Sequence, residues 1–187
     1  MCRFTKLIAA AFLLCVFATA SLAESSAQKK AEIRKMRSET LAKLYKREPR
    51  ARARIASAYG YAVFSNVGVN VILLSVAGGS GVAHENKSGR DIYMKMISGG
   101  VGPGLGIKDF RGIFVFENAR VFNAFVRNGF EGGAQANAVA KVGGKGGDAE
   151  AVVTVAPGIK FYQLTETGLA LEATLQGTKY FKDDDLN

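Results

Sequence analysis

Apolar residues recur at helical spacing in the segment before the first proline of the chain. They lie on one broad face, with Lys, Arg and Glu between them, and are spaced three to five positions apart except for the adjacent last two: Ile33, Met36, Leu41, Leu44 and Tyr45. This pattern predicts an amphipathic helix over 27–47. Pro49 interrupts it and suits a first helical turn, so a second short helix is expected over 50–58.

From Tyr59 onward short apolar runs separated by glycines replace the helical pattern. Strands are expected at 61–64, 90–97 and 112–117, and 69–77 is a buried strand or helix. Small or apolar residues alternate with mostly polar ones over 134–142 and 169–176, which is typical of half-buried antiparallel strands. One helix is expected in between, capped by Asn118 and ended by Gly129.

These elements predict a single-domain α+β fold. The expected core is a twisted, glycine-rich antiparallel sheet, closed or nearly closed like a barrel. Basic amphipathic helices lie at its N-terminal side, and one short helix is inserted within it. We expect no second domain and find no repeat of fixed period.

The N-terminal 23 residues have the pattern of a secretory signal peptide. Arg3 and Lys6 precede an apolar run over 7–18, and Ser21-Leu22-Ala23 offers a small-residue cleavage site. The alternative is an uncleaved anchor, although the run is short for a membrane span, which needs about 20 residues. A lipoprotein is disfavoured because Leu14, not a small residue, precedes Cys15. The expected divisions are therefore a signal peptide over 1–23, a basic helical segment over 24–49 and a domain over 50–187.

Charge is concentrated in one segment. Residues 28–54 hold eleven Lys and Arg against three Glu, a net +8, whereas residues 55–187 hold twelve of each sign. Such asymmetry indicates an anionic partner, either a membrane surface or nucleic acid. Nucleic acid is disfavoured by the expected export and by the lack of aromatic residues in the segment beyond Tyr45.

No catalytic or metal-binding set is visible. Cys2 and Cys15 would leave with the signal peptide, and the single histidine, His84, is expected to be a polar residue at a strand end. The glycine runs at 99–106 and 143–148 lack the spacing of phosphate-binding loops. The acidic run 183–185 is expected to be a solvated tail. The chain is predicted not to be an enzyme and to need no cofactor.

Several glycine-rich pieces, in order, carry a resemblance. They are AYGYAVFSNVG at 58–68, GGSGVAHE at 78–85, SGGVGPGLGIKDF at 98–110, GIFVFENARVFNAF at 112–125 and GLALEATLQGTKYFKDDDLN at 168–187. Together they resemble the SYLF domain family over about 50–187. The resemblance implies a lipid-binding module of the exported, stand-alone bacterial kind. The aromatic element common after the second glycine block is missing, and the chain has no Trp.

In relatives of the SYLF family, membrane contact is assigned to a basic amphipathic N-terminal helix, and we transfer that role to the corresponding segment here. The candidate basic lipid contacts are Lys29, Lys30, Arg34, Lys35, Arg37, Lys43, Lys46, Arg47, Arg50, Arg52 and Arg54. The candidate apolar contacts are Ile33, Met36, Leu41 and Leu44.

The leading hypothesis is an exported protein of the periplasm or envelope that binds an anionic phospholipid surface through this helix. In the alternative interpretation of the helix, its apolar face packs on the domain and the basic face is solvated. Two other functions remain open. One is a scaffold for an envelope protein partner, and the other is a carrier of a small apolar ligand inside the sheet.

Overall fold

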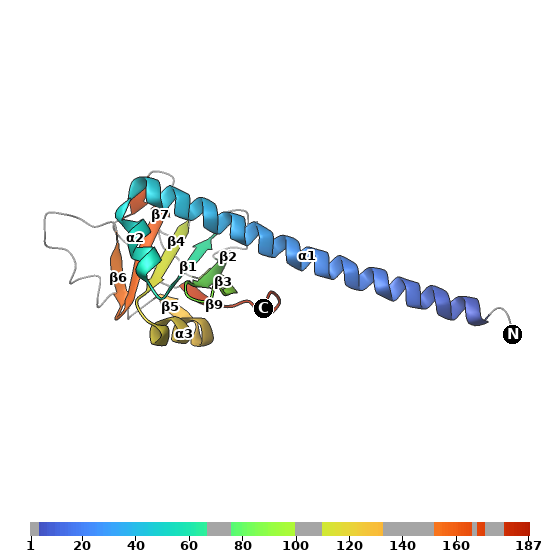
Figure 1. The fold of residues 1–187 in the computed structure, drawn as a ribbon. Coiled ribbons are helices and arrows are strands. Elements are labelled where there is room, and N and C mark those ends of the chain that lie inside the picture. The colour runs from blue at the N-terminus through green and yellow to red at the C-terminus, as the bar shows by residue number, and fades with distance from the viewer. Residues whose placement is uncertain (1–3, 67–75, 100–109, 133–151, 166–167, 171–177) are drawn as a thin grey trace, which may run out of the picture.

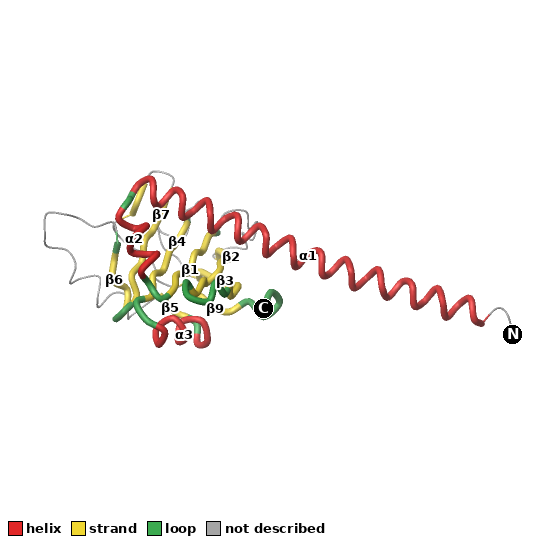
Figure 2. The backbone as a smooth tube through the Cα atoms, in the orientation of Figure 1, coloured by secondary structure: helices red, strands yellow, loops and turns green. Residues whose placement is uncertain are grey.

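The protein is an α+β domain with one long helix that extends beyond it, as a computed structural model shows (Figure 1). The structure describes residues 4–66, 76–99, 110–132, 152–165, 168–170 and 178–187. Figure 2 shows the helices on both sides of a curled sheet. The predicted fold class is confirmed.

The helices closely match the predicted ones. α1 spans Phe4–Arg47, α2 spans Arg50–Ser57, and α3 spans Ala119–Asn128. The Asn118 side chain accepts a hydrogen bond from the Val121 amide at the start of α3. Gly129, with φ of 74°, ends that helix in a conformation that favours glycine. The predicted helix over 27–47 is the second half of α1, which is continuous with the N-terminal segment.

Nine described strands form one sheet. They are β1 (Gly60–Ser65), β2 (Val76–Glu85), β3 (Asp91–Gly99), β4 (Arg111–Phe116), β5 (Phe130–Gly132), β6 (Val153–Ala156), β7 (Ile159–Thr165), β8 (Gly168–Ala170) and β9 (Thr178–Lys182). Their order is β5-β9-β3-β2-β1-β4-β7-β6, with β8 added beside β7, and every pair is antiparallel.

The predicted strands at 61–64, 90–97 and 112–117 correspond to β1, β3 and β4. The strand at 169–176 is confirmed at its start by β8, and its remainder lies outside the described residues. The segments 134–142 and 143–148, and nearly all of 69–77 and 99–106, also lie outside them.

Each face of the sheet packs against its own helix. On one face, phenylalanines of β1, β4 and β7 meet Phe122 and Phe125 of α3. On the other, β1, β4 and β7 place Val63, Ile113 and Tyr162 against α1 and α2. The sheet is therefore the middle of three layers, with α1 and α2 on one side and α3 on the other (Figure 1).

A glycine in β2 makes room for the Phe64 ring of β1. Gly81 is paired with Phe64, and a Cβ at position 81 would meet the Phe64 ring and would lie 2.6 Å from the Val63 carbonyl oxygen. The glycine-rich composition of β2 thus reflects close approach of side chains and backbone in the adjoining strand.

Candidate functional site

The apolar face of α1 lies on the sheet. Leu44 is 0% exposed and Ile33 is 5% exposed, while Met36 and Leu41 are partly buried against the same core. The geometry therefore corresponds to the alternative interpretation, in which this face packs on the domain. In this arrangement Ile33 and Leu44 cannot reach a bilayer, so these four residues are left out of the lipid contact proposed below.

Arg37 joins this helix to the sheet through a hydrogen-bonded ion pair. Its guanidinium donates to Asp91 Oδ1 of β3 at 2.5 Å, and the two side chains are 16% and 19% exposed. His84 Nδ1 of β2 lies 2.7 Å from the same oxygen, and the Tyr61 ring lies against the imidazole, with centroids 5.1 Å apart. Asp91 is thus shared by one residue from the helix and one from the neighbouring strand.

Other basic residues of the segment also contact the domain. Arg34 donates to the Tyr93 hydroxyl at 2.7 Å, and Arg54 donates to the Tyr162 hydroxyl at 2.6 Å. The Lys30 ammonium lies 5.3 Å from the Tyr93 ring centroid, and the Arg52 guanidinium lies 4.5 Å from that of Tyr45. Five of the eleven predicted basic contacts, including Arg37, therefore hold α1 and α2 in place.

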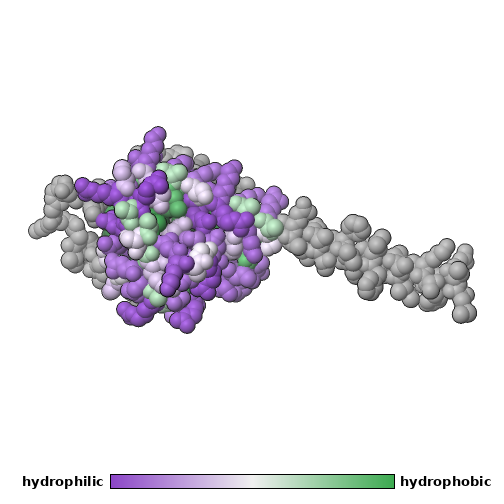
Figure 3. All heavy atoms as spheres, viewed as in Figure 1, coloured by the Kyte–Doolittle hydropathy of each residue, from purple (hydrophilic) through white to green (hydrophobic). Residues whose placement is uncertain are grey.

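The remaining basic side chains of the segment are exposed. They are Lys29, Lys35, Lys43, Lys46, Arg47 and Arg50. Lys35 is 4.0 Å from Glu39 one turn on, but both side chains are at least half exposed, so this pair contributes little. Figure 3 shows the hydrophilic character of this described surface. These six residues are called the outer basic surface below.

Residues 183–187, called the strap below, pack on the domain through Asp183 and Leu186, so the acidic run is only in part the solvated tail that the sequence predicted. Asp183 is only 5% exposed, and Lys95 Nζ lies 2.8 Å from both Asp183 Oδ1 and Asp185 Oδ2. These carboxylates raise the pKa of Lys95, and Lys95 in turn lowers the pKa of Asp185. Asp184 and Asp185 remain exposed, so the prediction was wrong for Asp183 because its lysine partner is distant in sequence.

Asn187 at the end of this strap pairs with the β3 backbone. Its side-chain oxygen accepts from the Tyr93 amide at 3.0 Å, and its Nδ2 donates to the Tyr93 carbonyl at 2.8 Å. Leu186 packs with Ile33 and Tyr93 beneath α1. The strap therefore completes the surface on which the helix is seated.

The described residues include no group of three or more His, Cys, Asp or Glu side chains placed to hold a metal ion. His84 lies near the end of β2, as expected, but its contacts with Asp91 and Arg37 were not foreseen. In the same part of the chain, no helix has the length and apolar character needed to cross a membrane.

Comparison with known proteins gives one informative relationship. No family model matches the chain. The chain is 36% identical over 154 residues to a protein of Aeromonas veronii named Beta cell expansion factor A. The match covers 82% of this chain and 57% of that protein, so the chain corresponds to little more than half of its relative's length. Most of this chain is thus similar in sequence to part of Beta cell expansion factor A.

Proposed function

We propose that this chain is an exported, non-enzymatic, SYLF-type protein that binds anionic phospholipid surfaces from the periplasm or cell envelope. The observation that carries the proposal is the outer basic surface, a set of exposed Lys and Arg side chains on α1 and at the start of α2, two helices that pack on the sheet through their apolar residues. The resemblance to the SYLF family supports the same function.

The mechanism is adsorption of a preformed cationic surface. Lys35, Lys43 and Lys46 would approach lipid phosphates while Leu44 stays in the core. Each basic residue near an anionic leaflet contributes about 1 kcal/mol, so a few acting together give useful partitioning. Because these side chains are exposed, salt should weaken the binding strongly. Insertion of an apolar helix face is not part of this mechanism.

Vesicle co-sedimentation tests the proposal. The protein, purified in the form that the cell produces, should bind phosphatidylglycerol-containing vesicles at low salt, release them at high salt and ignore phosphatidylcholine vesicles. The triple variant K35Q/K43Q/K46Q should lose about 3 kcal/mol of binding, roughly a hundredfold in affinity.

The matched control is K87Q/R120Q/K179Q, which removes the same charge from exposed positions outside the segment. It should bind nearly as the parent does. If the two triple variants lost equal vesicle affinity, the binding would depend on net charge alone. That outcome would contradict a binding role for the outer basic surface. Failure of the parent to bind either vesicle would make an envelope protein the leading partner.

A further inference from the structure

An open pocket lies beside the first residues of β3, beyond the end of its pairing with β9. β9 pairs with β3 only from Met94 onward, so the Asp91–Tyr93 edge is bordered by the strap instead. The cavity has a volume of about 670 Å³ and is lined from α1, β3, α3, β9 and the strap. This size falls within the range of pockets that hold small ligands.

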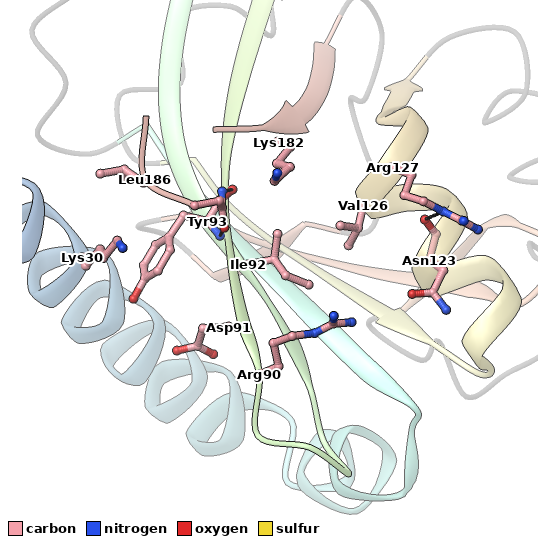
Figure 4. Close-up of a pocket in the computed structure, with 11 residues that line it drawn as sticks. Lys30, Arg90, Asp91, Ile92, Tyr93, Asn123, Val126, Arg127, Lys182 and Leu186 are labelled. Carbon is pink, nitrogen blue, oxygen red and sulfur yellow. Dashed lines mark hydrogen bonds between the residues drawn. The ribbon is translucent and has the colours of Figure 1, made fainter. Parts of the chain in front are cut away.

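Four cationic side chains from four different parts of the chain line this pocket. They are Lys30, Arg90, Arg127 and Lys182. Figure 4 shows Arg90, Arg127 and Lys182 around Ile92 and Val126. These four cations come from separate elements, and Lys30 and Lys182 stand near opposite ends of the chain. No local run of the sequence therefore predicts that they line one pocket.

The nearby carboxylates leave much of this positive charge in place. Asp91 also lines the pocket, but it is already bonded to Arg37 and His84. Arg90 lies 3.1 Å from Glu85, and these side chains are 57% and 13% exposed, so Glu85 neutralises part of this charge. Lys182 lies 3.5 Å from Asp184, and these side chains are 46% and 88% exposed, so this exposed pair contributes little. Arg127 donates through Nε to the Asn123 carbonyl, which leaves its charge unneutralised by that bond.

Apolar side chains and two asparagines, Asn123 and Asn187, also line the pocket. Ile92 and Val126, 8% and 9% exposed, belong to the core on the α3 side of the sheet, whereas Leu186, 6% exposed, packs with Tyr93 on the α1 side. A small anion in water would gain nothing from these apolar groups. A ligand that joins an anionic group to an apolar one would contact both parts of the pocket.

We propose that this pocket binds a phosphate monoester, with its dianionic group among Arg90, Arg127 and Lys182 and its organic part over Ile92 and Val126. Three cations match a phosphate dianion better than they match a singly charged carboxylate, and guanidinium groups donate paired hydrogen bonds to phosphate oxygens. The ester could be a lipid headgroup or a water-borne metabolite. Apart from Lys30, none of the basic residues of α1 and α2 lines this pocket, and the proposal does not depend on the outer basic surface.

Calorimetric titration without vesicles tests this site. The probes are short-chain phosphatidic acid below its micellar concentration, glycerol 3-phosphate and short-chain phosphatidylcholine. At least one phosphate monoester should bind, and R127Q/K182Q should weaken it by at least tenfold. Binding of phosphatidic acid alone identifies a lipid source, and binding of both monoesters identifies the phosphate ester itself.

Two controls keep the outcome interpretable. K87Q/R120Q removes equal charge away from the pocket and should leave the affinity unchanged, while K35Q/K43Q/K46Q should lose vesicle binding and retain the monoester. Thermal unfolding confirms that R127Q/K182Q is folded, which is expected because Arg127 and Lys182 are exposed. Absence of monoester binding to the parent, equal affinity of parent and R127Q/K182Q, or equal binding of phosphatidylcholine would overturn the proposal.

Discussion

Arg37 and Asp91, 54 positions apart in sequence, form a 2.5 Å hydrogen-bonded ion pair that fixes α1 to β3. Both side chains are less than one-fifth exposed, so the pair is shielded from much of the solvent screening that weakens surface pairs. The same basic segment that supplies the outer basic surface therefore also supplies a partly buried ion pair that holds α1 on the sheet.

Removing the Arg37–Asp91 ion pair should destabilise the fold. We expect Arg37→Ala to lower the free energy of unfolding by about 2 kcal/mol, because Asp91 would lose a charged donor in a mostly buried position. Urea unfolding followed by circular dichroism measures the change. Lys35→Ala, at an exposed position of the same helix, is the control and should alter stability by less than about 0.5 kcal/mol. Equal effects of the two substitutions would contradict a structural role for Arg37.

Substitution of Leu44 distinguishes packing of α1 on the sheet from insertion of α1 into a membrane. Leu44→Ala should cost about 2–5 kcal/mol of stability, because the side chain is fully buried against β1, β4 and β7. Below the unfolding transition, binding to anionic vesicles should be unchanged. If Leu44 entered the bilayer instead, the same substitution would weaken vesicle binding and leave stability in buffer nearly intact.

The Glu85 carboxylate should make stability fall in acid. Hydrogen bonds from Tyr59 and Ser88, with Arg90 nearby, hold the pKa of Glu85 below its usual value. A lowered folded-state pKa means that the unfolded chain takes up the proton first, so this contribution is present above the unfolded pKa, about 4.3, and is lost as pH falls through the folded pKa. Unfolding midpoints measured from pH 6 to pH 3 should fall less steeply for Glu85→Gln than for the parent. If the midpoints of the parent and of Glu85→Gln fell equally with pH, Glu85 would not contribute to the loss of stability in acid.

Asn187 should protect the unpaired part of β3. Asn187→Ala removes both side-chain hydrogen bonds to the Tyr93 backbone and should cost about 1–2 kcal/mol. Hydrogen exchange at the Tyr93 amide should accelerate, whereas Asp184→Ala, at an 88% exposed side chain, should leave it unchanged. Unchanged exchange in Asn187→Ala would show that the strap does not cover this edge.

Cleavage after Ala23 remains a prediction, and the intact mass of the exported protein tests it. A mass corresponding to residues 24–187 is expected, and a full-length mass would favour the uncleaved anchor. Among the described side chains of α1, Ile33 is the first that is buried. Cleavage at this position should therefore leave the unfolding free energy of the domain nearly unchanged.

Local patterns predicted the elements better than their contacts. The spacing of Ile33 and Leu44 and the caps Asn118 and Gly129 are local signals, and they located α1 and α3 correctly. The same spacing could not show whether Leu44 faces a bilayer or a sheet, because both are apolar surroundings. β9 was missed because Thr178–Lys182 is short and has no regular alternation of apolar and polar residues, and its place in the sheet depends on β3. The ion pair of Asp183 with Lys95 forms only when distant segments of the chain meet, and the same holds for the pocket. Neither could therefore be predicted from a local run of residues.

The three-layer arrangement also sets how the domain would stand on a surface. Because α1 and α3 cover opposite faces of the sheet, adsorption through α1 makes α3 the layer farthest from the lipid. A fluorophore attached at position 43 should then be quenched by spin-labelled lipids, and one at position 120 should not. The protein would present the same side to the surrounding water, with α3 outermost, on any anionic membrane that it binds.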